Sequence, residues 1–176
     1  MPSLSEESGF DLGILSPAEG TVRPVFESMF SDYGPAVAPG GEWIAYTSAQ
    51  SGRHEVYLCR FPEGSGCELA SRGGGTFPAW SPSGDELFYL DAGAMMAVTV
   101  DLATDPPAVG EPAELFRGDY VSGSFGFRHP YAVAPDGRFL MGKMADGPTE
   151  DEPPGKRIVV VQNWAEEVRA RVPVTP

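Results

Sequence analysis

The sequence predicts an all-β fold built from a repeated unit, and three observations carry this prediction. One phrase of strand, turn and strand occurs three times, with turn prolines at Pro39, Pro82 and Pro135, so the spacings are 43 and 53 residues. The 176 residues include 22 glycines and 18 prolines, which is typical of many short strands joined by turns. The segment after each turn is strongly apolar. Repetition at this period indicates a repeat architecture.

The same residue types explain the turn in each copy. Proline at the first central position has its φ preset, and the glycine that follows two residues later accepts the positive φ that leads into the next strand. The third copy, Ala134-Pro-Asp-Gly137, is the most complete. Gly40 and Ser83 replace the aspartate in the first two copies, and both still allow the turn.

The strands after the turns do not alternate between apolar and polar residues. Apolar neighbours stand at the same place in each copy: Ile44 and Ala45, Leu87 and Phe88, Leu140 and Met141. Such strands are covered on both faces, as in sheets that stack on neighbouring sheets. This is the environment of an inner strand in a β-propeller blade of ~40–45 residues. We therefore expect a partial β-propeller with about two full four-stranded blades, two partial blades and a short C-terminal helix.

The repeat divides the chain into four parts. We expect residues 1–34 to end a preceding blade, 35–75 to form a blade, 76–129 to form a blade with a long connecting loop, and 130–176 to form the last partial blade and a closing helix. A closed propeller needs ~4–8 blades, so the chain is expected to be the C-terminal part of a longer protein or a half-propeller that pairs with a second copy. The strands are expected at residues 10–15, 21–26, 36–38, 43–48, 54–60, 67–71, 78–80, 86–90, 94–101, 112–116, 139–144 and 157–162, and the helix at about 164–171.

The order and spacing of these motifs resemble the WD40-like (PD40) repeat of TolB-type propellers, most closely the propellers that follow the kinase domain in bacterial serine/threonine protein kinases. The resemblance departs at Ala38 and Ala134, where the repeat usually has serine, and at Gly40 and Ser83, where it usually has aspartate. It implies a sensor or scaffold domain outside the cytoplasm. The residues that carry it are Trp43–Ser48, Ser51–Leu58, Arg60–Pro62, Gly73–Thr76, Pro78–Pro82, Glu86–Tyr89, Phe139–Met141 and Val159–Glu167.

Composition excludes several classes of partner. The formal net charge is −13, from 12 basic and 25 acidic residues, so nucleic acid and a bare anionic membrane would be repelled. No apolar run is long enough to insert into a bilayer, and the first ten residues do not form a signal peptide. The compartment is therefore left to the family resemblance.

The two cysteines flank a predicted hairpin loop. Cys59 and Cys67 could face each other across the hairpin and form a disulfide in an oxidising compartment. Two free thiols are the favoured interpretation. Two cysteines and two distant histidines do not make a zinc site, and the acidic segment 146–152 lacks the alternating, glycine-bearing pattern of a calcium loop, so no metal or cofactor is expected.

The sequence contains no recognisable catalytic motif of the phosphate-loop, nucleophile-elbow or triad kind. Gly73–Gly75 lacks the following lysine of a phosphate loop, and Ser81 and Ser122 lack the frame of a nucleophile elbow. No carboxylate stands at a recognisable triad spacing from His54 or His129. We therefore expect a chain without catalytic residues, and any catalytic domain would lie outside it.

The favoured candidates for recognition lie on the long connection before the third copy. Asp119, Tyr120, Arg128 and His129 combine aromatic, charged and histidine side chains beside glycine hinges, with Phe125 and Phe127 between them. The main hypothesis is a non-catalytic module that binds a protein or ligand, with the remaining blades supplied in cis or by a second copy in trans. The alternatives are a TolB-like envelope protein or the propeller portion of a prolyl-oligopeptidase-like peptidase.

Overall fold

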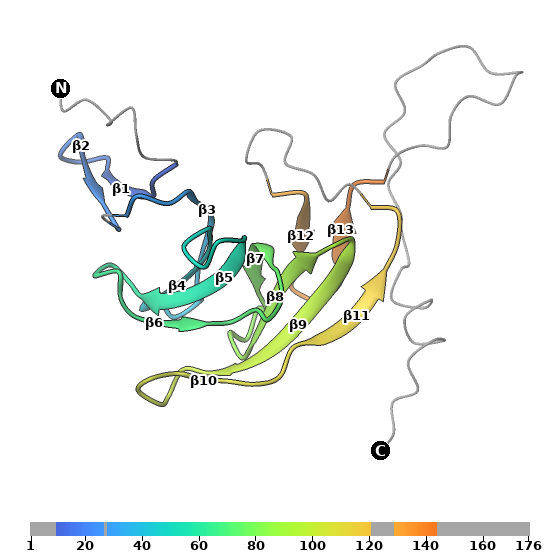
Figure 1. Ribbon diagram of the computed structural model, residues 1–176. Coiled ribbons are helices and arrows are strands. Elements are labelled where there is room, and N and C mark those ends of the chain that lie inside the picture. Colours follow the sequence, from blue (N-terminus) through green and yellow to red (C-terminus); the bar gives the residue numbers. More distant parts are fainter. Residues whose placement is uncertain (1–9, 27, 121–128, 144–176) are drawn as a thin grey trace, which may run out of the picture.

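The computed structural model describes residues 10–26, 28–120 and 129–143, and every regular element in these ranges is a β-strand. All strand pairs are antiparallel and form four sheets that follow one another in chain order (Figure 1). The two central sheets have four and five strands, and a two-stranded sheet lies at each end. This confirms the predicted all-β class with two full and two partial blades.

The first full blade has the order β3-β4-β5-β6, where β3 is Asp32–Val37, β4 is Trp43–Ser48, β5 is Glu55–Arg60 and β6 is Ser65–Leu69. All six residues of β4 are buried, as the unbroken apolar run predicts. The outermost strand β6 is mostly exposed. Burial therefore falls from the centre of the sheet to its outer edge.

The second full blade contains β7 (Thr76–Trp80), β8 (Glu86–Asp91) and β9 (Ala94–Asp101). Two further strands, β10 (Ala108–Val109) and β11 (Ala113–Arg117), both pair with β9. The short strand β10 lies between the predicted strands 94–101 and 112–116, where the sequence predicts no strand. The last described sheet pairs β12 (Tyr131–Val133) with β13 (Phe139–Met141).

The turn phrase has the same geometry in all three copies. In each, the glycine N–H donates to the carbonyl three residues earlier: Gly41 to Ala38 at 2.8 Å, Gly84 to Ser81 at 3.0 Å and Gly137 to Ala134 at 2.9 Å. The three glycines have φ of 77°, 79° and 80°. Proline, a small residue and glycine therefore form the predicted turn each time.

The innermost strands are longer than the sequence predicts. β3 begins at Asp32 rather than residue 36, and β7 at Thr76 rather than residue 78. Each strand is interrupted by a bulge, and the residue that takes a left-handed φ there is Gly34 (63°) or Phe77 (55°). The bulge lets pairing resume on its far side, so the proline that follows does not end the strand.

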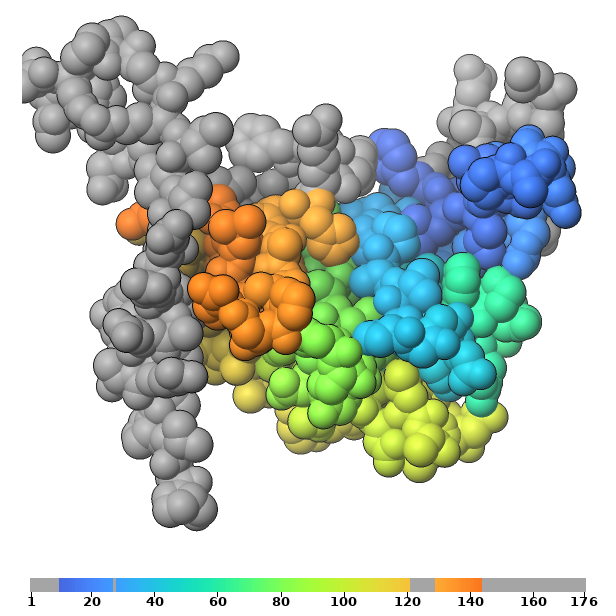
Figure 2. Space-filling view, turned by 180° about the vertical axis from the view of Figure 1, so that it is seen from behind, coloured from blue at the N-terminus to red at the C-terminus, as the bar shows by residue number. Residues whose placement is uncertain are grey.

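The blades pack through their first strands. β3 packs on β7, and β7 packs on β12, while the outer strands diverge (Figure 1). The space-filling view shows the blades side by side in chain order (Figure 2). The Trp80 indole N–H donates to the Ala36 carbonyl at 2.9 Å, and the Tyr131 hydroxyl donates to the Phe77 carbonyl at 2.7 Å. Hydrogen bonds therefore join neighbouring blades near their inner strands.

The N-terminal hairpin repeats the relation between one blade and the next. It pairs β1 (Gly13–Ser16) with β2 (Thr21–Pro24). The bond from Val25 N–H to the Leu12 carbonyl matches that from Ala70 N–H to the Val56 carbonyl, both at 2.8 Å. The bond from Asp32 N–H to the Phe10 carbonyl likewise matches that from Gly75 N–H to the His54 carbonyl. β1 and β2 are thus equivalent to β5 and β6: each pair is an outer hairpin that bonds to the first residue of the next blade's inner strand or to the residue just before it, β3 in one case and β7 in the other.

The predicted strand 157–162 and the predicted closing helix at about 164–171 lie outside the described residues. The recognition candidate Arg128, with Phe125 and Phe127, also lies outside them.

Candidate functional site

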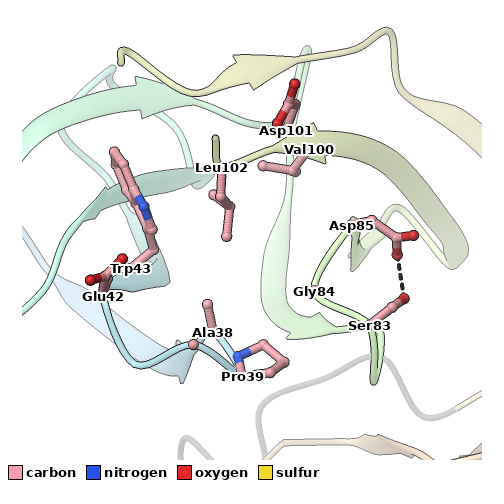
Figure 3. Close-up of a pocket in the computed structure, with 11 residues that line it drawn as sticks. Ala38, Pro39, Glu42, Trp43, Ser83, Gly84, Asp85, Val100, Asp101 and Leu102 are labelled. Atoms are coloured by element: carbon pink, nitrogen blue, oxygen red, sulfur yellow. Dashed lines mark hydrogen bonds between the residues drawn. The ribbon is translucent and has the colours of Figure 1, made fainter. Parts of the chain in front are cut away.

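A groove separates the turns of the two full blades (Figure 3). It has a volume of about 340 Å³ and lies between the turn at Pro39, the turn at Gly84 and the end of β9. A Cβ on Gly84 would lie 3.3 Å from Pro39, so the two turns are in close contact at the floor. Its lining is Ala38, Pro39, Gly40, Glu42, Trp43, Ser83, Gly84, Asp85, Val100, Asp101 and Leu102.

Three carboxylates make this groove acidic, but two of them serve their own turns. Asp85 accepts hydrogen bonds from the hydroxyls of Ser81 and Ser83, and these bonds hold its pKa below the ordinary value. Asp101 accepts from the Ala103 N–H at 2.9 Å. The groove would therefore attract a positively charged partner more than a negatively charged one. Asp85 and Asp101 are occupied by hydrogen bonds within their own turns, so these carboxylates do not form a catalytic pair.

A second surface is formed by aromatic rings near the starts of β3 and β7 and on the segment directly before β12. Tyr33 on β3 meets Phe77 on β7 edge to face, with ring centroids 5.6 Å apart, and Phe77 meets His129 at 5.7 Å. His54 extends the series, 5.4 Å from Tyr33. We call these four residues the inner aromatic row. Phe77 is buried, whereas Tyr33 is half-buried and the two histidines are exposed, so the row has an accessible side.

The inner aromatic row contains a strained backbone and a perturbed histidine. Phe77 has φ of 55°, a conformation that bulky side chains rarely adopt. Partial desolvation of the imidazole lowers the pKa of His129, and a hydrogen bond with the backbone of Gly34 only partly opposes this shift. His129 is therefore neutral at pH 7 and can act as both donor and acceptor.

The structure places the predicted recognition residues at separate points. Asp119 is exposed, and Tyr120 packs against Phe116 at 5.8 Å and forms an isolated bridge with Lys143. His129 belongs to the inner aromatic row instead. Sequence reasoning missed Tyr33 and Phe77. Tyr33 lies six residues before the turn proline Pro39 and Phe77 five before Pro82, and these neighbouring positions in the repeat were the signal that could have found them.

The prediction of two free thiols is wrong. Cys59 and Cys67 form a disulfide with a Cα–Cα distance of 4.2 Å. Tyr57 pairs with Leu69 and Leu58 with Glu68, so the register brings Cys59 opposite Cys67. The hairpin predicted from sequence is correct, and its two strands meet at the cysteines.

Potential nucleophiles in the described ranges have structural partners. The Ser81 hydroxyl bonds within its own turn, to Asp85 and to the N–H groups of Gly84 and Glu86. Within the described ranges, no side-chain hydrogen bond or ion pair joins His54 or His129 to a serine or a carboxylate, and both rings contact aromatic neighbours. No group of three or more His, Cys, Asp or Glu side chains there is arranged to hold a metal ion. In the same ranges, no helix is long and apolar enough to cross a membrane.

Solved structures resemble this architecture. One is described as TolB from Agrobacterium tumefaciens and another as TolB from Acinetobacter baumannii, each with a TM-score of 0.51 and 23% identity over 74% of this chain. The chain spans 48% and 32% of their lengths, less than half of either. The described part thus shares the fold of TolB propellers. No family model and no curated protein matches the sequence.

Proposed function

We propose that this chain is part of a non-catalytic β-propeller that binds a protein or ligand through the inner aromatic row. One observation carries the proposal: two successive inner strands, β3 and β7, and the segment directly before β12 each contribute a ring to one series of edge-to-face contacts with a partly exposed side. Aromatic rings on a rigid scaffold give large contact area at a low entropic cost. The strained φ of Phe77 also fits a binding surface, because strain concentrates at functional sites.

The parent protein that we propose is a larger sensor or scaffold protein, such as a bacterial serine/threonine kinase with a C-terminal propeller. The motif resemblance supports this context, and a TolB-like envelope protein fits equally well. We propose the divisions 1–34, 35–75, 76–129 and 130–176 as its successive blade units. The repeated hydrogen bonds at Val25 and Asp32 support the first of these divisions.

An oxidising compartment also belongs to the proposal. Disulfides persist outside the cytoplasm and are rare within it, so the bond between Cys59 and Cys67 supports an extracytoplasmic propeller. This agrees with the compartment that the family resemblance implies.

Selection of a displayed random-peptide library against the full chain tests the binding role. We expect selected peptides to lose about tenfold or more in affinity with Tyr33→Ala and His129→Ala, and to be unaffected by Thr99→Ala, an exposed side chain on β9. Peptides that bind all three variants equally would contradict the assignment to the row. Hydrolase activity intrinsic to the purified chain would contradict the non-catalytic role and favour the peptidase alternative.

A further inference from the structure

A second pocket, beside the first full blade, contains a buried carboxylate with one oxygen that has no hydrogen-bond partner among the described residues. The pocket has a volume of about 480 Å³ and lies between the segment after β2, the start of β3 and the turn that joins β5 to β6. Asp32 is 2% exposed, and its Oδ2 accepts from the Ser28 hydroxyl at 2.8 Å. Its Oδ1 has no hydrogen-bond partner within the described part of the chain. A buried carboxylate oxygen without a donor carries a desolvation cost that a bound cation would offset.

The repeat itself does not require this carboxylate. Asp32 and Gly75 are equivalent, because each donates its N–H to the matching carbonyl of the preceding outer hairpin. At Gly75 a Cβ would lie 2.7 Å from Ser71 and 3.1 Å from Tyr89, so the second blade has no room for a side chain. The first blade instead has an aspartate and an open pocket. Asp32 is therefore a feature of this pocket and not of the blade pattern.

The contrast with Glu55 supports the same conclusion. Glu55 is the other carboxylate buried near a blade crossing, and it accepts from Arg53, from the Ser71 hydroxyl and from the Gly74 N–H. Both of its oxygens are used within the chain. Asp32 has one oxygen in use and one left for a ligand.

The other walls identify the chemistry of the ligand. Glu63 adds a second carboxylate and Gln50 an amide, and none of the described residues that line the pocket is basic. The rings of Phe26 and Tyr46, stacked with centroids 4.2 Å apart, form an aromatic wall. Carboxylates beside aromatic rings suit an organic cation, whereas Ca²⁺ takes six to eight oxygen ligands.

We propose that this pocket binds an ammonium or guanidinium group, with Asp32 as its counter-ion. The group belongs to a free amine or to a lysine or arginine side chain of a protein. None of the residues that line this pocket belongs to the inner aromatic row, so the test of this site is independent of the test of the proposed function.

Calorimetric titration of the full chain tests this proposal with four cationic probes: agmatine, 1,4-diaminobutane, N-acetyl-arginine amide and N-acetyl-lysine amide. We expect saturable binding of at least one probe, with shifts of the Gln50 side-chain and Gly64 backbone amide signals in NMR spectra. Tighter binding of the free amines would identify a small-molecule ligand, and tighter binding of the blocked amino acids a protein side chain. The neutral isostere N-acetyl-citrulline amide should not bind.

Three variants locate the site. Asp32→Asn should weaken binding about tenfold or more, Glu63→Gln a few-fold, and Glu86→Gln, an exposed carboxylate on β8, not at all. Circular dichroism shows whether Asp32→Asn folds; if it does not, the exposed Glu63→Gln variant and the citrulline probe decide. Three results would overturn the proposal. They are wild-type affinity for the cationic probes in both the Asp32→Asn and Glu63→Gln variants, binding of N-acetyl-citrulline amide as tight as that of N-acetyl-arginine amide, or binding of CaCl₂ but of none of the four cationic probes.

Discussion

The Ser71 hydroxyl donates a hydrogen bond to the carboxylate of Glu55 and accepts one from the Val56 N–H at 2.8 Å. Both side chains are buried, and Ser71 lies on the segment that leaves the first full blade for the second. The same carboxylate accepts from the Gly74 N–H at 3.1 Å. One glutamate on β5 therefore fixes the path of the chain between two blades.

Replacing this glutamate should weaken the fold. Glu55→Gln should lower the free energy of unfolding by about 1–3 kcal/mol at pH 7, because buried donors lose a charged acceptor. Glu114→Gln is the control, since its ion pair with Arg117 is exposed and should contribute less than about 1 kcal/mol. Urea unfolding followed by tryptophan fluorescence measures both. Equal effects of the two substitutions would contradict the assigned role.

The contribution of Glu55 should also depend on pH. Burial raises its pKa, but hydrogen bonds from Ser71, Arg53 and Gly74 and the charge of Arg53 outweigh this, so the net pKa lies below the ordinary 4.5. A depressed folded-state pKa stabilises the fold above pH 4.5, and this stabilisation is lost as the pH falls through the folded-state value. The difference between wild type and Glu55→Gln should therefore shrink on acidification. A difference that grows below pH 4.5 would contradict this sign.

The left-handed backbone at Gly34, in the bulge of β3, predicts that this position favours glycine. Gly34→Ala should destabilise the protein by about 1–2 kcal/mol, because a φ of 63° is unfavourable for any residue with a Cβ. Gly40→Ala, in open space without a positive φ, should be neutral or stabilise slightly. Thermal unfolding compares them. A Gly34 variant as stable as the Gly40 variant would show that the bulge is not needed.

The hydroxyl of Tyr131 should stabilise the contact between the last described sheet, β12–β13, and the second full blade. It donates to the carbonyls of Phe77 at 2.7 Å and Phe88 at 3.1 Å, and the residue is buried. Tyr131→Phe should cost about 1–3 kcal/mol in urea unfolding. Tyr57→Phe serves as the control, because that hydroxyl makes no hydrogen bond in the described part of the chain. An unchanged unfolding midpoint for Tyr131→Phe would contradict the prediction.

The disulfide predicts sensitivity to reduction. A cross-link between residues eight apart should contribute about 2–3 kcal/mol by restricting the unfolded chain. Reducing agent should lower the urea midpoint of the wild type but not that of the double variant Cys59→Ala and Cys67→Ala. Thiol titration of the unfolded, unreduced protein should find no free thiol. Two reactive thiols would contradict the bond.

Much of the fold could be predicted because the repeat encodes it locally. Proline and glycine in the first turn, with the unbroken apolar run that follows, predicted 43–48 with the same bounds as β4. The apolar segment 94–101 was likewise predicted with the same bounds as β9. The early starts of β3 and β7 could not be predicted this way, since Gly34 and Pro35 are ordinary strand breakers unless a bulge accommodates them.

The candidate sites were less predictable because they depend on contacts between blades. The ring contacts of Tyr33, Phe77 and His129 join residues far apart in sequence, and only the packing of β3, β7 and β12 brings them together. The orphaned oxygen of Asp32 likewise reflects the arrangement of three segments. Of the predicted recognition residues that the structure describes, Asp119, Tyr120 and His129, the last lies in the inner aromatic row.

The most direct test of the proposed parent propeller is to follow the reading frame upstream of the Met1 codon in genomic DNA. The hydrogen bonds of β1 and β2 match those of β5 and β6, so a preceding blade should supply the strands that pair inside β1. We predict that the frame continues into further copies of the proline–x–glycine turn phrase, about 40–45 residues apart, and then into a kinase domain or an export signal. An in-frame stop and a ribosome-binding site directly before Met1 would contradict this account.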